Sequence, residues 1–323
     1  MGFGVVSMLN AVFRRTFISA GLRPSSAAVD ADDDTTIHLW AHPSLLHSSS
    51  SEEQQQRRPV VVLIHGFGPD PTWQWAAQVG PLSRHFDLVV PTLLFFGASS
   101  TRAAARSDAF QAAALASLLH HHDHLPGLLV GGAGGRTVHV VGTSYGGLVA
   151  YHLARELVAA KRSVVVVGKV ALCSADAGKG ADDDRALAAK GGVAEVTELM
   201  APADTKGLRR LMALCVHRPP KYIPECLLRD MLRKYFAHRR EDKIALIKGI
   251  VTVEGFHLTP LPQDVLIIWG EFDQIFPVEK AHKLKEKLGE KATVKVIPNT
   301  GHLPQQEDPK LFNRVLLDFL LQP

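Results

Sequence analysis

Short runs of apolar residues recur along the chain and alternate with longer amphipathic stretches. Residues 60–64 read VVVLI, a continuous apolar run of the kind found in a strand that is buried on both faces of a parallel sheet. The same type of run recurs at 87–90, 138–141, 164–172, 265–269 and 294–297, and an alternating run at 35–40 precedes them all.

Segments with helical periodicity separate these predicted strands. They span residues 73–83, 108–121, 145–160, 278–288 and 311–320. Strands that alternate with helices form right-handed βαβ units, which build a mostly parallel, doubly wound sheet. The chain is therefore expected to have an α/β fold.

The alternation is interrupted once, in the second half of the chain. Between Asp176 and Leu258 there is no buried strand pattern, only polar helical segments such as 225–235 and 242–251. We expect this stretch to form a helical cap over the carboxyl edge of the sheet, where such folds bind ligands. The expected organisation is an N-terminal segment, a core in two parts and the cap, over residues 1–34, 35–175, 259–323 and 176–258.

Composition and charge narrow the class of protein. The 323 residues are 46% hydrophobic and 21% charged, as in ordinary soluble domains. The net charge of +4 is too small to indicate a nucleic-acid partner. Cys173, Cys215 and Cys226 form no C-x-x-C pair, so a reducing compartment such as the cytoplasm is expected.

The first thirty residues carry a signal of their own. They are amphipathic, include Arg14 and Arg15, and contain no acidic residue before Asp30. Three interpretations stay open: a helix packed on the domain, a transit peptide to an organelle such as the chloroplast, or a helix on a membrane surface. No apolar run is long enough to cross a bilayer, and residues 48–59 are expected to form a polar surface loop.

A single serine stands at a predicted strand-to-helix junction. Gly142-Thr143-Ser144-Tyr145-Gly146 fits G-x-S-x-G, with an apolar strand before it and a helix after it. Glycines at positions 142 and 146 permit a turn so tight that it lifts the Ser144 hydroxyl above the sheet. Because a serine hydroxyl is a poor nucleophile, it needs a base beside it.

The candidate base and acid follow the last two predicted strands. His302 lies in NTGH after residues 294–297, and Asp273 lies in WGEFD after residues 265–269. The order Ser, Asp, His is that of the nucleophile-elbow hydrolases. Asp176 also follows a strand and remains a second candidate for the acid; Asp273 is preferred for its turn setting and short path to His302.

A glycine-rich loop follows the strand at 60–64. In His65-Gly66-Phe67-Gly68 the glycines let backbone amides turn inward. Acyl transfer needs two such amides around the developing oxyanion, and we assign them to Phe67 and Tyr145. His65 is expected to hold this loop by hydrogen bonding.

No metal or organic cofactor is expected. The histidine-rich stretch 120–124 has the composition of a metal site, but its residues are consecutive at a helix end, where side chains diverge.

The motifs HGFG, GTSYGG, WGEFD and NTGH, in this order, resemble those of the α/β-hydrolase fold superfamily from about Thr35 onward. The stretch 91–99 is similar to the plant branch of capped serine hydrolases that is likened to bacterial meta-cleavage C–C hydrolases, although Thr92 replaces the aspartate expected there. The resemblance implies a serine esterase with Ser144, Asp273 and His302 as its triad. Ser144 excludes the relatives that use an aspartate nucleophile.

Alternative functions remain open at this stage. They are cleavage of a C–C bond in a diketone-type substrate, a ligand receptor like the plant karrikin and strigolactone receptors, and a membrane-associated lipase. Residues 205–248 contain twelve Lys and Arg against four Asp and Glu. This balance indicates either a solvated helical face or a positive rim that attracts a carboxylate-bearing substrate or an anionic lipid surface. The sequence does not define the oligomeric state.

Overall fold

The structure is a computed structural model that describes residues 4–47, 58–120, 123–129, 136–160, 165–250 and 258–322. Its centre is one eight-stranded sheet with the order β1-β2-β4-β3-β5-β6-β7-β8. The strands are β1 Arg23–Asp30, β2 Thr35–Ala41, β3 Val60–Ile64, β4 Asp87–Pro91, β5 Arg136–Thr143, β6 Val165–Cys173, β7 Asp264–Gly270 and β8 Ala292–Ile297. From β4 to β8 all neighbours are parallel, whereas β1 and β2 join the sheet antiparallel.

The mostly parallel sheet predicted from the apolar runs is thus confirmed, with one strand missed. Every residue of β3 and β4 is buried, as their continuous apolar sequences predict. Strand β1 was not predicted because only Ala27 and Val29 of its eight residues are buried. An edge strand with one neighbour needs few apolar residues, so its sequence carries a weak signal.

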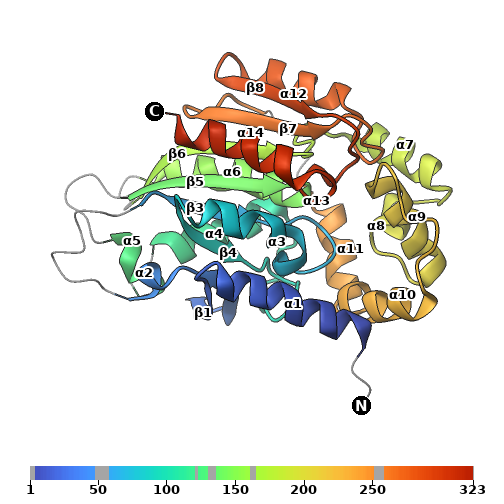
Figure 1. Cartoon of the computed structure of the whole chain (residues 1–323), viewed down its shortest axis with the longest axis horizontal. Coiled ribbons are helices and arrows are strands. Elements are labelled where there is room, and N and C mark those ends of the chain that lie inside the picture. Colours follow the sequence, from blue (N-terminus) through green and yellow to red (C-terminus); the bar gives the residue numbers. More distant parts are fainter. Residues whose placement is uncertain are drawn as a thin grey trace.

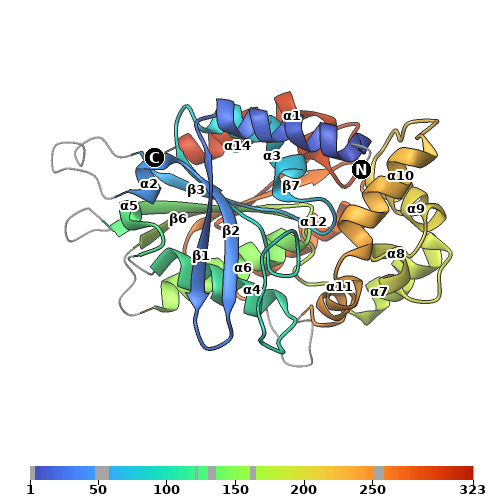
Figure 2. The same cartoon turned by 90° about the horizontal axis from the view of Figure 1, so that it is seen from below.

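Helices cover both faces of the sheet. Helices α1 Val5–Ser19, α3 Pro71–Leu82 and α14 Pro309–Leu321 pack on one face, while α4 Asp108–His120, α6 Tyr145–Ala159 and α12 Glu279–Leu288 contribute to the apolar core on the other. Figure 2 shows the sheet between α1 and α3 on one side and α4 and α6 on the other. Short helices α2 Pro43–Leu46 and α5 Pro126–Leu129 lie away from the site described below, and α13 Pro304–Glu307 precedes α14.

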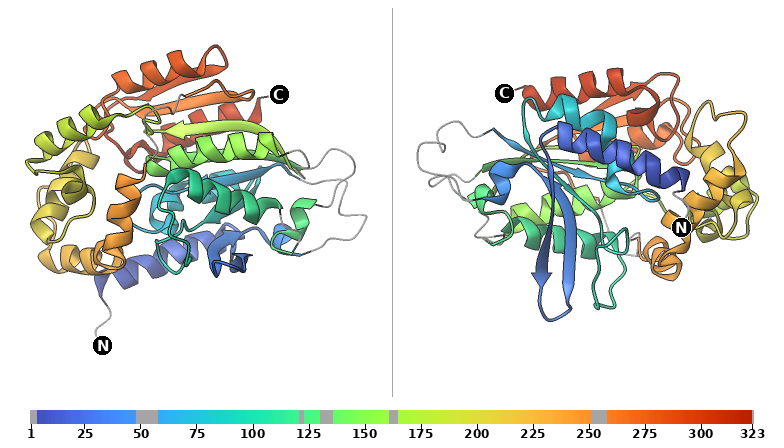
Figure 3. Two further views of the ribbon diagram at one scale, coloured as in Figure 1. Left: turned by 180° about the vertical axis from the view of Figure 1, so that it is seen from behind. Right: turned by 60° about the horizontal axis from the view of Figure 1, so that its bottom comes forward.

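The described residues between β6 and β7 form helices joined by loops, without a strand. It holds α7 Ala181–Gly191, α8 Val196–Met200, α9 Thr205–Cys215, α10 Glu225–Met231, the π-helical turn η2 Leu232–Ala237 and α11 Arg240–Lys248. We call residues 181–248 the helical insertion. It gathers at one end of the sheet, as the front and back views show (Figures 1 and 3). It has its own apolar cluster, which includes Leu199, Leu208 and Leu228.

Helix α1 packs on the domain. Val6 and Phe17 are buried, and the backbone N–H of Val6 donates a hydrogen bond of 3.0 Å to Asp230 in α10. Asn10 accepts hydrogen bonds from the side chains of Trp73 and Tyr235, which ties α1 to α3 and to η2. These contacts are those of a helix packed on the domain, which is the first of the three interpretations of the N-terminal segment. No helix among the described residues combines the length and apolar character needed to cross a bilayer.

Candidate active site

Ser144 lies at the sharp turn between β5 and α6. Its backbone φ of 52° is in the left-handed region, which a non-glycine residue rarely occupies. The turn is closed by two glycines, as expected. A Cβ atom at Gly142 would lie 2.1 Å from the Gly146 carbonyl oxygen, and one at Gly146 would lie 2.3 Å from the His65 carbonyl oxygen. Only glycine fits at either position.

The structure brings the three predicted triad residues together. His302 Nε2 lies 2.8 Å from Ser144 Oγ, and His302 Nδ1 lies 2.8 Å from Asp273 Oδ2. All three side chains are more than nine-tenths buried. The Asp273 carboxylate is held in place because its Oδ1 accepts hydrogen bonds of 2.9 Å from the backbone N–H groups of Ile275 and Phe276.

The second candidate acid, Asp176, faces another partner. Its carboxylate lies 3.0 Å from Lys280 Nζ in α12 and also accepts a hydrogen bond from the N–H of Gly178. Lys280 contacts Asp183 of α7 as well, at 2.6 Å. Asp176 therefore fastens the start of the helical insertion to the core, and Asp273 is the carboxylate beside His302.

The glycine-rich loop is braced by two buried side chains. His65 Nδ1 donates to the Gly66 carbonyl at 2.8 Å, and Nε2 accepts from the N–H of Leu93 at 3.0 Å. Burial lowers the pKa of His65 to about 4, so its ring is neutral near pH 7. Gln74 accepts from the Gly66 N–H at 2.7 Å and donates to the Gly66 and Pro69 carbonyls. The loop-holding hydrogen bonds expected of His65 are present.

The two residues assigned to the oxyanion hole stand side by side. The Phe67 ring meets the Tyr145 ring edge to face, with 5.8 Å between centroids, and it meets Phe96 in the same way at 5.2 Å. Gly68 follows with a φ of 115°. Tyr145 opens α6, so its amide belongs to the positive end of a helix.

These features are those of a known family, and the comparison with family models agrees. A model of the alpha/beta hydrolase family matches residues 61–315, most of the chain. The chain belongs to the α/β-hydrolase family.

Within this family, the chain is similar in sequence to curated proteins of different kinds. It is 29% identical over 264 residues to the dihydrolipoyllysine-residue acetyltransferase component of an acetoin cleaving system from Cupriavidus necator, covering 79% of this chain. The chain spans 62% of the length of that relative. A lipase from a Moraxella species is 26% identical over 77% of this chain and 73% of its own.

Among solved structures, the fold is similar to that of a 2-hydroxy-6-oxo-6-phenylhexa-2,4-dienoate hydrolase from a Rhodococcus strain. The TM-score is 0.69 at 20% identity, over 93% of this chain and 99% of that one. This likeness is one of fold, and it agrees with the resemblance to C–C hydrolases that the motifs indicated.

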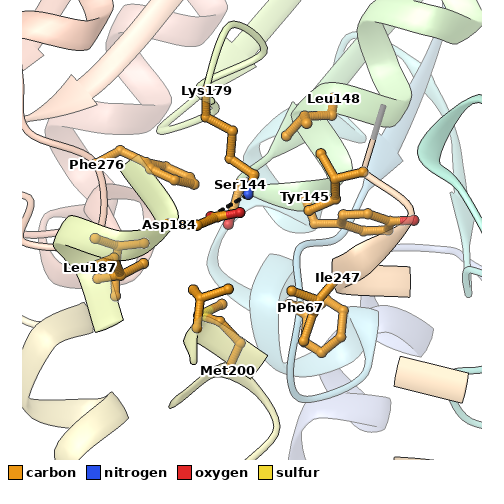
Figure 4. A pocket seen from close by; sticks show the side chains of 13 residues that line it. Phe67, Ser144, Tyr145, Leu148, Lys179, Asp184, Leu187, Met200, Ile247 and Phe276 are labelled. Carbon is orange, nitrogen blue, oxygen red and sulfur yellow. Dashed lines mark hydrogen bonds and ion pairs between the residues drawn. The ribbon is translucent and has the colours of Figure 1, made fainter. Parts of the chain in front are cut away.

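A pocket with a cavity volume of about 40 Å³ opens beside the Ser144 hydroxyl of this α/β hydrolase. The core contributes Phe67, Tyr145, Leu148, Ile275 and Phe276, and the helical insertion with its flanks contributes Lys179, Asp184, Leu187, Val196, Met200, Ile247 and Ile250. Figure 4 shows both sets of side chains around Ser144. The walls are apolar apart from Ser144, Tyr145 and the pair Lys179 and Asp184.

One carboxylate that the sequence analysis missed ties the helical insertion to the His302 loop. Glu307 in α13 accepts from the N–H of Gly301 at 2.7 Å and from the N–H of His217 at 2.8 Å. The N–H of His302 itself donates to the Cys215 carbonyl at the end of α9. No local pattern marks Glu307, because one of its partners is 90 residues away.

No group of three or more His, Cys, Asp or Glu side chains suited to a metal ion occurs among the described residues. Of the histidine-rich stretch 120–124, positions 121 and 122 lie outside the described residues.

Proposed function

We propose that this protein is a serine hydrolase that cleaves carboxylic esters through an acyl-enzyme. The observation that carries the proposal is the unbroken hydrogen-bonded series from Ser144 through His302 to Asp273. In this arrangement His302 is neutral, with its proton on Nδ1 facing Asp273 and its Nε2 lone pair facing the serine hydroxyl.

The acylation half-reaction follows from these positions. His302 Nε2 takes the proton of Ser144 as Oγ attacks the ester carbonyl carbon, and Asp273 stabilises the imidazolium that forms. The amides of Phe67 and Tyr145 are proposed to hold the resulting oxyanion. The C–O bond then breaks, and the leaving alkoxide receives the proton from His302.

In the deacylation half-reaction, water replaces the alcohol. His302 removes a proton from that water, the hydroxide attacks the acyl carbonyl, and Ser144 leaves as its hydroxyl is reprotonated. All proton transfers in this scheme use His302, so the proposed reaction requires no cofactor.

Sequence similarity to relatives favours an ester over a C–C bond as the bond that is cleaved. The lipase is similar in sequence over three quarters of the chain, whereas the likeness to the dienoate hydrolase is one of fold at 20% identity. The helical insertion is proposed to act as the cap that shapes the substrate side of the pocket.

A fluorophosphonate probe tests the chemistry directly. Wild-type protein is expected to be labelled at Ser144, and Ser144→Ala is expected to remain unlabelled while keeping its circular dichroism spectrum. Asp176→Asn is the matched control and should still be labelled. A folded wild type that resists the probe would contradict the proposal.

A substrate panel then separates the remaining functions. A series of p-nitrophenyl esters of increasing chain length is expected to turn over many times, and a vinylogous 1,5-diketone is expected to be cleaved slowly or not at all. Preferred cleavage of the diketone would indicate a C–C hydrolase. A single slow turnover with a ligand-induced shift of the melting temperature would indicate a receptor.

A further inference from the structure

A charged pair lies inside the pocket beside Ser144. Lys179 comes from the loop between β6 and α7, and Asp184 comes from the first turn of α7. Lys179 Nζ and Asp184 Oδ1 are 2.5 Å apart. Figure 4 shows the pair facing the same space as the Ser144 side chain, among Leu148, Leu187 and other apolar groups.

Among the described residues, the Lys179 ammonium has fewer acceptors than donors. Its side chain is 5% exposed, and an ammonium carries three N–H donors. Within the described ranges, Asp184 is the one acceptor that its Nζ contacts. Because a buried charge is costly unless it is hydrogen-bonded, two donors without an acceptor among the described residues favour a further anionic or polar group at this position.

Of the two charged partners, Asp184 is the one that a substrate group can displace. Its side chain is 31% exposed, and it also borders a second cavity that α7, α8 and α11 enclose. Lys179, Val196, Ile247 and Ile250 line both cavities. Lys179 therefore lies at the boundary between the pocket at Ser144 and the second cavity.

We propose that Lys179 binds a carboxylate of the substrate, with Asp184 occupying that place in the free protein. The inference rests on the proposed function, since it assigns a substrate class to the same pocket. The preferred esters would have an acyl chain that ends in a carboxylate. The scissile carbonyl would lie at Ser144 and the methylenes along the apolar walls, so that the carboxylate meets Lys179.

The test compares paired esters that differ in one charge. Each pair has equal carbon number: p-nitrophenyl pentanoate, hexanoate and heptanoate against the mono-p-nitrophenyl esters of glutarate, adipate and pimelate. The quantity measured is the ratio of kcat/KM for the charged ester to that for the neutral ester, corrected for spontaneous hydrolysis.

Lys179→Met is expected to lower this ratio by about tenfold to a hundredfold for at least one chain length, the effect of losing a hydrogen bond to a charged group. The neutral ester should lose less activity than the charged ester, and the ratio of the two is the quantity that decides. Lys179→Arg keeps the charge and should keep most of the ratio. The matched control is Lys190→Met, which also replaces one lysine by methionine. Lys190 lies in the last turn of α7 and does not line the pocket.

Asp184→Asn is expected to raise the ratio severalfold, because it removes the anion that competes with the substrate carboxylate. This variant decides the matter if Lys179→Met does not fold: a raised ratio supports the assignment, and an unchanged one overturns it. Equal losses on both esters in Lys179→Met would show that the pair only holds α7 in place. If wild type cleaves no ester, the proposed function fails; if it cleaves only the neutral ones, this inference alone fails.

Discussion

Two regions of the molecule line the pocket: the sheet edge that carries Ser144, and the helical insertion. They are built in different ways. At the sheet edge, Ser144 directly follows β5, and Asp273 and His302 lie in the loops after β7 and β8. Hydrogen bonds with backbone groups hold all three. On the side of the helical insertion, the side chains that reach the pocket come from three helices and from the two flanking segments that hold Lys179 and Ile250. An apolar cluster and ion pairs hold this part together. The candidate catalytic residues thus depend largely on strand ends and backbone hydrogen bonds, one of which joins His302 to the end of α9, whereas the insertion side of the pocket depends on the packing of helices.

The largest expected effect separates two carboxylates, Asp273 beside His302 and Asp176 beside Lys280. Asp273→Asn should reduce kcat by about 10⁴-fold, or about 5 kcal/mol, because an amide facing Nδ1 favours the wrong tautomer of His302. Asp176→Asn should leave kcat within about threefold and lower the melting temperature, since Asp176 pairs with Lys280. Steady-state kinetics on an ester, with a thermal melt, measure both. The reverse outcome would identify Asp176 as the acid.

The second prediction compares two glycines. Gly142→Ala should destabilise the fold by about 3 kcal/mol or more, because the new Cβ would lie 2.1 Å from a backbone oxygen. Gly192→Ala, just after α7, has open space around it and a φ of 61°, so it should cost only about 1 kcal/mol. Denaturant unfolding measures the difference. Equal costs would show that the elbow can relax.

The third prediction concerns the pH dependence of stability at the glycine-rich loop. His65 has an ordinary pKa of 6.5 when unfolded and about 4 when folded. The unfolded state therefore binds the proton first, and stability falls as pH drops from about 6.5 to about 4, by at most about 3 kcal/mol. His65→Gln should flatten this part of the curve of unfolding free energy against pH. A parallel curve would indicate that other groups, such as His139, account for the loss.

The smallest expected effect tests the connection between the two regions. Glu307→Gln should lower kcat about tenfold, because an amide can accept from only one of the two N–H groups that the carboxylate serves. Glu307→Ala should cost more, and Lys310→Ala in the next helix should change kcat little. Stopped-flow acylation rates give the measure. Unchanged rates in both Glu307 variants would show that the His302 loop needs no support from α13.

Much of the sheet and the main site residues could be predicted from the sequence because their signals are local. Continuous apolar runs mark strands buried on both faces, and motifs of a few residues mark Ser144, Asp273 and His302 at strand ends. Parallel strands place those ends at one edge, so the sequence predicts that Ser144 and His302 meet there and leaves Asp273 and Asp176 as candidates for the acid. Strand β1 lacked such a signal, since an edge strand buries few side chains.

By itself, the sequence determined the α/β class, the elbow and the candidate residues for acyl transfer, since each depends on neighbours along the chain. Only the tertiary structure placed Asp273 and not Asp176 beside His302, packed α1 against α3 and α10, and brought Glu307 and the Lys179–Asp184 pair to the site. The reason is physical: these relations join residues that are distant in sequence or lie on the helical insertion. Their distances are set by how helices pack on the sheet, and no local pattern encodes that packing.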